Sequence, residues 1–248
     1  MNEAPAFRAE PQSPTSDACA VPKALVWDAP VRIFHWLMAF CFAGAYLTAE
    51  SERWRLLHVT LGYTMIGLVA FRILWGLIGT RPARFKNFLR GPSAVKRYLQ
   101  SILSRRPEHH VGHNPAGAWA IVGLLALTLM VGATGWAAYN SVGGESLEGA
   151  HELLANTMLA LVGLHIAGVV VSSWIHRENL VGTMISGRKS AEPGSGIRTA
   201  HYSVAGLMIA AVLAFWILQW QSAPATGGAN SRDHSFSHVK HGDQDKDD

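Results

Sequence analysis

Residues 151–175 read HELLANTMLALVGLHIAGVVVSSWI, and this stretch decides the fold class. Its part at 153–175 contains no Asp, Glu, Lys or Arg. A helix of this length crosses the roughly 30 Å hydrocarbon core of a bilayer. Buried helices of soluble proteins rarely run this far without a charge. We therefore predict that this stretch is a transmembrane helix.

Further apolar blocks of similar length lie on either side, separated by polar or charged sequence. They cover 31–49, 58–79, 117–138 and 202–221. The last two carry no charged residue, and the block at 58–79 carries only Arg72. The pattern predicts an all-α membrane protein with five transmembrane helices.

The composition of the whole chain agrees with this fold class. The 248 residues are 49% hydrophobic and 15% charged, whereas soluble domains are about 25% charged. This balance excludes a disordered chain and argues against an ordinary soluble enzyme. The two cysteines exclude a disulfide framework, an iron–sulfur cluster and a C-x-x-C-H haem attachment.

The charges between the predicted helices orient the chain in the membrane. The loop at 80–116 holds eight Lys and Arg residues and one acid, whereas 139–152 holds three acids and no Lys or Arg. Basic loops stay in the cytoplasm. We therefore expect a cytoplasmic N-terminus and a periplasmic C-terminus. The polar stretch at 1–26 is expected to be disordered and is no signal peptide.

Four of the twelve histidines fall within or at the edges of the predicted helices. His35 opens the first helix at its cytoplasmic side, and His58 opens the second helix at the opposite side. His151 lies at the outer start of the fourth helix, and His165 follows fourteen residues later, about 21 Å deeper. Fourteen residues come within about 40° of four full turns, so both side chains point the same way. Ionisable residues at this depth usually have a function and a partner.

The four histidines match in depth as two pairs. His58 meets His151 near the outer surface, and His35 meets His165 near the inner surface. Two imidazoles that face each other from different helices have the axial geometry of a b-type haem. A structural zinc ion would need four ligands at one point, but these residues are divided between two leaflets. The pattern predicts two bis-histidine haems that carry electrons across the membrane.

Arg72 has two interpretations of equal weight. It follows His58 by fourteen residues, so it shares that helix face but lies near the inner leaflet. There it is a candidate partner for the propionates of the inner haem, or an arginine that extends to the lipid headgroups. Gly62 and Gly168 lie close to His58 and His165 and would let a flat macrocycle approach the backbone.

Short motifs around these residues resemble the bacterial cytochrome b561 and nickel–iron hydrogenase b-type cytochrome family. They are VRIFHW at 31–36, LHVTLGY at 57–63, GHNPAG at 112–117, HELLAN at 151–156 and GLH at 163–165. The resemblance covers residues 27–188, and all four ligand positions of the family are filled in order.

The resemblance implies a four-helix transmembrane bundle with two haem b groups in a bacterial inner membrane. His35 and His165 would be the iron ligands of one haem, and His58 and His151 those of the other, with Arg72 at a basic position. It also implies electron transfer between the quinone pool and a hydrogenase, a dehydrogenase or a cytochrome c. We expect an electron-transfer subunit and not a complete enzyme, with no catalytic residue and no nucleic-acid partner.

The expected organisation is a disordered cytoplasmic N-terminus at 1–26, a di-haem domain at 27–188, a fifth transmembrane helix within 189–222 and a disordered periplasmic tail at 223–248. The fifth helix and the long basic loop at 80–116 look more like the larger hydrogenase-type cytochromes. Neither carries a ligand motif, so the redox partner stays open.

Several weaker signals have more than one interpretation. A quinone site near the outer haem has candidates in Glu145, Glu148, Glu152 and Asn156, although ordinary acids that keep the outer side negative are preferred. His109, His110 and His113 lie in an arginine-rich loop, where solvated side chains are favoured over a metal site. The basic loop either binds anionic lipid headgroups or only retains this side in the cytoplasm.

Two other classes of function compete with electron transfer. A transporter or channel could use intramembrane histidines as a proton or metal relay. Such proteins usually contain broken helices or internal repeats, and neither is visible in this sequence. A passive membrane anchor for a larger complex would tolerate replacement of all four histidines.

Overall fold

The structure is a computed structural model that describes residues 23–104, 115–190 and 196–222. Five helices in this part of the chain are long and apolar enough to cross a membrane. They are α1 (Ala29–Thr48), α2 (Arg55–Ile78), α5 (Pro115–Tyr139), α6 (Gly144–His176) and α8 (Tyr202–Ser222). The prediction of an all-α membrane bundle is confirmed. The tail at 223–248 and the loop histidines His109, His110 and His113 lie outside the described residues.

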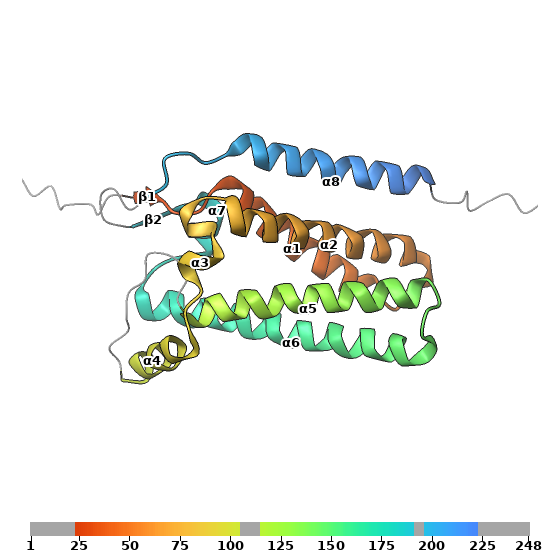
Figure 1. The fold of residues 1–248 in the computed structure, drawn as a ribbon, viewed down its shortest axis with the longest axis horizontal. Helices are drawn as coiled ribbons and strands as arrows, with labels where there is room; N and C mark the ends of the chain where they lie inside the picture. Colours follow the sequence, from red (N-terminus) through yellow and green to blue (C-terminus); the bar gives the residue numbers. More distant parts are fainter. Residues whose placement is uncertain (1–22, 105–114, 191–195, 223–248) are drawn as a thin grey trace, which may run out of the picture.

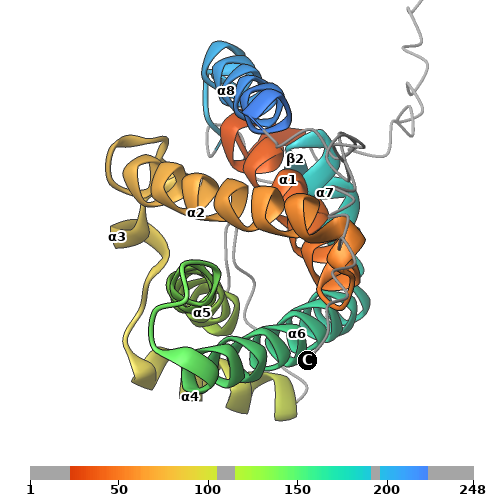
Figure 2. The same cartoon turned by 90° about the vertical axis from the view of Figure 1, so that its right-hand side faces the viewer.

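The five long helices form three layers (Figures 1 and 2). Helices α1 and α2 make the middle layer, and α5 and α6 pack side by side against one of its faces. Helix α8 covers the other face through contacts with α1 and α2. The predicted four-helix core therefore consists of two helix pairs, and the fifth helix lies outside it.

The connections between the long helices differ at the two ends of the bundle (Figure 1). The basic end carries η2 (Arg81–Ala83), α3 (Phe85–Phe88), α4 (Pro92–Leu103), α7 (Leu180–Ser186) and the strands β1 (Lys23–Leu25) and β2 (Arg188–Ser190). The acidic end has only η1 (Glu52–Trp54) and the short turn at 140–143. Loop length is therefore strongly asymmetric across the membrane.

Strands β1 and β2 correct the prediction for the N-terminus. The sequence pattern predicts disorder over 1–26, but residues 23–25 pair with 188–190 in an antiparallel two-stranded sheet. Gly187, at φ +76°, turns the chain after α7, and its carbonyl accepts hydrogen bonds from the backbone of Val26 and Trp27. Residues 1–22 lie outside the described part of the chain.

Helix α6 begins earlier than the apolar pattern predicts. It starts at Gly144 and not near residue 153, so His151 lies seven residues inside the helix and not at its start. The first turns contain Glu145 and Glu148, which are good helix formers and are favourable near a helix N-terminus. The charges end the apolar run without ending the helix.

A buried cluster fills the middle of the bundle between the layers. It consists of Cys41, Ala45, Leu61, Met65 and Met158. Cys41 is fully buried, as expected for a small core residue. On the opposite face of α2, the Trp216 indole donates a hydrogen bond to the Thr64 hydroxyl (2.9 Å), which attaches α8 to the core.

Asp28 joins three segments at the basic end. Its side chain is 1% exposed and caps α1 by accepting from the backbone N–H of Val31 (2.9 Å). Its second carboxylate oxygen accepts from the Trp75 indole N–H (3.0 Å) and from the Thr80 hydroxyl. One buried carboxylate therefore ties the start of α1 to the end of α2 and the following loop.

Candidate functional site

His58 and His151 face each other between α2 and α6 near the acidic end. Their ring centroids lie 6.2 Å apart, and the two ring planes are nearly perpendicular at 80°. Both side chains are half-buried. Two residues that are 93 positions apart in the sequence are thus neighbours at one depth in the bundle.

Backbone carbonyls determine which ring nitrogens of this pair are free. The Nδ1 atom of His58 lies 2.8 Å from the carbonyl oxygen of Ala45, and Nδ1 of His151 lies 3.0 Å from that of Val131. A carbonyl oxygen only accepts hydrogen bonds, so both Nδ1 atoms carry a proton and donate it. The neutral tautomer then leaves a lone pair on each Nε2, which is the form that ligates a metal.

A glycine on the neighbouring helix makes room for one of these rings. A Cβ atom at Gly135 would lie 2.8 Å from Cε1 of His151, closer than side chains approach one another. Helix α5 can therefore pass directly beside the His151 ring only with glycine at this position.

His35 and His165 lie together between α1 and α6, nearer the basic end. The two side chains are close enough for a charge on one to act on the other. The Nδ1 atom of His35 is buried and makes no hydrogen bond to any residue that the structure describes. This pair therefore lacks the carbonyl contact that holds Nδ1 of His58.

The donor set and spacing fit a bis-histidine haem. Two metal–nitrogen bonds of about 2 Å, plus half a ring on either side, bring two ring centroids to about 6 Å apart. His58 and His151 have this spacing. Groups of three or more His, Cys, Asp or Glu that would suit a metal ion are absent from the described residues. A zinc site made of these histidines therefore finds no support.

Arg72 is buried at the basic end of α2 and is only 3% exposed. Its guanidinium lies over the ring of Phe85 at 4.8 Å and over that of Phe88 at 5.9 Å, and it interacts electrostatically with Asp28. Nη1 makes no hydrogen bond within the described residues. This environment differs from that of an arginine that extends along lipid to the headgroups.

The other predicted residues are not brought together. Glu145, Glu148 and Glu152 are exposed at the acidic end. Asn156 accepts a hydrogen bond from the Tyr46 hydroxyl (2.9 Å), which links α1 to α6. A Cβ atom added at Gly62 or Gly168 would meet nothing within 4 Å, so there is open space beside both glycines.

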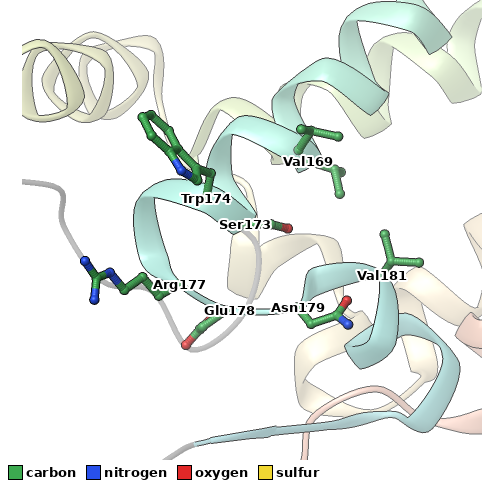
Figure 3. A pocket seen from close by; sticks show the side chains of 8 residues that line it. Val169, Ser173, Trp174, Arg177, Glu178, Asn179 and Val181 are labelled. Carbon is green, nitrogen blue, oxygen red and sulfur yellow. The ribbon is translucent and has the colours of Figure 1, made fainter.

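A groove lies where α6 ends and α7 begins (Figure 3). Val169, Val170 and Val181 give it an apolar wall, and Ser173 and Asn179 add polar groups. Trp174, Arg177 and Glu178 complete the lining. Val169 follows His165 by one helical turn, so the groove is on the side of the inner histidine pair.

Sequence patterns did not identify several of the residues around the site. Gly135 touches His151 from another helix, and no local signal distinguishes it from other glycines. Phe85 and Phe88 cover Arg72 from within the basic loop. Asp28 does have a signal, because an acid followed by Ala-Pro is typical of a helix N-cap.

Comparison with known proteins identifies the family. A model of the prokaryotic cytochrome b561 family matches residues 26–187, which is well over half of the chain. The chain belongs to the prokaryotic cytochrome b561 family. The resemblance predicted from the motifs is therefore confirmed, and membership of a b-type cytochrome family implies haem b as cofactor.

Curated relatives of this cytochrome b561 family member share a quarter or more of its residues. A probable Ni/Fe-hydrogenase 1 B-type cytochrome subunit of Escherichia coli strain K12 is 29% identical over 142 residues, covering 46% of this chain and 60% of the relative. The chain thus spans 60% of that relative's length. Probable Ni/Fe-hydrogenase B-type cytochrome subunits of Rhizobium leguminosarum and Rhodobacter capsulatus are each 25% identical, covering 66% of this chain and 87% and 80% of the relatives. No solved structure matches the chain.

Proposed function

We propose that this cytochrome b561 family member transfers electrons across the bacterial inner membrane, through two haem b groups, between the quinone pool and a redox protein. The observation that carries the proposal is the His58–His151 pair, with centroids 6.2 Å apart and both Nδ1 atoms donating to backbone carbonyls. Family membership supports electron transfer by a membrane cytochrome.

The proposed ligand sets are His58 with His151, and His35 with His165. Helix α6 contributes one ligand to each set and is continuous over both positions. It would therefore hold the two irons about 21 Å apart along its axis. When bound, haem b supplies one-electron transfer between ferric and ferrous iron.

The relatives' names support a hydrogenase as redox partner, because several relatives are probable Ni/Fe-hydrogenase cytochrome subunits. The distribution of charge supports a cytoplasmic basic end, since cytoplasmic loops retain Lys and Arg. On this orientation, the His58–His151 pair lies near the periplasm, and the C-terminus is periplasmic.

The groove of Figure 3 is the proposed binding site for the quinone headgroup. Its valine wall suits an apolar ring and tail, and Ser173 and Asn179 offer a hydroxyl and an amide to the quinone oxygens. Val169 places this groove one turn from His165, which is close enough for electron transfer with the inner pair.

The rival transporter function finds less support in the fold. Transporters usually bind their substrate at helices that are broken near the membrane midplane. Helices α2, α5, α6 and α8 are each continuous over 21 residues or more. A histidine relay would also need a chain of donors and acceptors, whereas Nδ1 of His58 and His151 both end at backbone carbonyls.

The haem content of the purified full-length protein tests the proposal. We expect a b-type α-band in the reduced-minus-oxidised spectrum and two haem b per chain by pyridine haemochrome assay. A chain without haem would contradict electron transfer. One haem per chain would contradict the assignment of two ligand pairs.

Filling the groove tests the quinone site. We expect Val169→Trp to raise the KM for a water-soluble quinol about tenfold, equivalent to a loss of about 1.4 kcal/mol of binding. Reduction by dithionite should be unchanged, because the haems do not depend on the groove. Leu164→Trp, on an exposed part of α6 outside the groove, is the matched control. An unchanged KM in Val169→Trp would contradict this placement of the quinone.

Arg72 is the proposed partner of the inner haem propionates. We expect Arg72→Gln to lower the midpoint potential of one haem, because loss of a nearby positive charge disfavours the reduced, more negative centre. The shift is on the order of 50 mV for one unit charge in a partly buried site. Redox titration at the α-band measures it, and Arg72→Lys should restore part of the shift. Two unchanged potentials would assign Arg72 a structural role only.

A further inference from the structure

The segment at 81–100, here called the basic segment, is rich in positive charge. Residues 80–103 contain six Lys and Arg residues and no Asp or Glu. Its exposed cations are Arg81, Lys86, Arg90, Lys96 and Arg97. They follow one another along η2, α3 and α4 at the basic end of the bundle (Figure 1). No acidic residue within this segment neutralises them.

Helix α4 separates apolar and polar side chains onto two faces. Val95 is half-buried and Tyr98 is 2% exposed, on the face where α4 contacts α5. Lys96, Arg97 and Gln100 lie on the exposed face. An apolar face toward the bundle and a cationic face away from it are typical of helices that lie in the membrane interface.

Two tryptophans indicate where the membrane surface meets this end of the molecule. Trp119, near the start of α5, is 46% exposed, and Trp174, near the end of α6, is 82% exposed. Tryptophans of membrane proteins gather at the level of the lipid headgroups. The Trp119 indole donates to the backbone carbonyl of Arg90 (2.9 Å), so the basic segment is attached at that level.

The direction of α4 agrees with this level. Figure 2 looks along the long helices, and α4 lies across their direction at the end of the bundle. A helix that runs along the membrane surface keeps its exposed cations at a constant depth. Lys96 and Arg97 then remain beside the headgroups, and neither extends away from the bilayer.

We propose that the basic segment is a binding surface for the headgroups of anionic phospholipids. Phosphate oxygens accept hydrogen bonds from guanidinium and ammonium groups, and several exposed cations at one depth suit a layer of negative headgroups. An acidic protein would approach from the aqueous phase, but α4 presents its cations at the level of Trp119 and Trp174. The proposal is independent of the haems and of the quinone.

Spin-labelled lipids test the proposal on the full-length protein in phosphatidylcholine vesicles. Electron paramagnetic resonance measures the fraction of spin-labelled phosphatidylglycerol and of phosphatidylcholine held at the protein surface. We expect the wild type to prefer phosphatidylglycerol by about threefold or more, since each basic residue at the surface adds to the attraction. The preference should weaken in 0.5 M salt, as expected of screened surface charges.

Charge-neutral variants connect the preference to the basic segment. Arg90→Gln, Lys96→Gln and Arg97→Gln together should bring the two lipids close to equal binding. A second variant, Lys86→Gln with Lys96→Gln, keeps Arg97 and should lose part of the preference. The matched control, Arg53→Gln with Arg55→Gln, removes exposed cations at the acidic end and should retain it.

Other outcomes would overturn the proposal. Equal binding of both lipids by the wild type would show that the segment binds no anionic headgroups. A preference that persists in both charge-neutral variants would assign these cations to membrane topology or to an acidic protein partner.

Discussion

Replacing His151 with alanine is expected to remove one of two haems, and replacing His58 should remove the same one. Each replacement takes away one of the two nitrogens that face each other across 6.2 Å. His35→Ala and His165→Ala should remove the other haem. Pyridine haemochrome content should fall from two to one per chain in each variant, and electron transfer across the membrane should be lost.

Pairing is tested by comparing the haem that remains. The His58 and His151 variants should keep the same α-band and midpoint potential, and the His35 and His165 variants should keep the other set. His176→Ala, at the end of α6 and outside both pairs, is the control that retains two haems. If His58→Ala and His35→Ala kept the same haem, the proposed pairing would be wrong.

Replacing Asp28 with alanine should strongly destabilise the basic end of the bundle. The change leaves the Val31 N–H, the Trp75 indole and the Thr80 hydroxyl without their acceptor. It also removes the negative charge that faces the buried Arg72. Breaking such a buried charge arrangement costs about 3–5 kcal/mol. Denaturant unfolding of the detergent-solubilised protein, followed by tryptophan fluorescence, measures the loss.

Two further variants separate the charge of Asp28 from its hydrogen bonds. Asp28→Asn keeps an oxygen for the cap of α1 and should cost less than the alanine variant. Glu52→Ala removes an exposed carboxylate that lies 3.7 Å from Arg55, and exposed ion pairs contribute at most about 1 kcal/mol. Equal stability of Asp28→Ala and Glu52→Ala would refute the role assigned to Asp28.

The parts of the structure that repeat along one helix were accessible from the sequence. Apolar length alone predicts the five spans. The rise and rotation of a helix predict that His151 and His165 share a face, and depth predicts that His58 lies beside His151. The structure places these two rings together. Each of these inferences depends on regular geometry and needs no knowledge of how helices pack.

Contacts between distant segments were not accessible in this way. Gly135 matters because α5 passes His151, and only packing determines which glycine of α5 does so. Strands β1 and β2 have three residues each and join segments 165 positions apart, so neither shows a recognisable period. The early start of α6 was missed because its acidic first turns resemble a loop.

The carbonyl contacts of His58 and His151 bear on proton movement. Each Nδ1 proton is already donated to a backbone oxygen, of Ala45 or of Val131, and each Nε2 is the proposed iron ligand. Neither ring then has a nitrogen left to take up or release a proton when an electron arrives. Charge would cross this half of the membrane as electrons alone. The uptake and release of protons would belong to the quinone at the other end, so the site would separate the two kinds of charge in space.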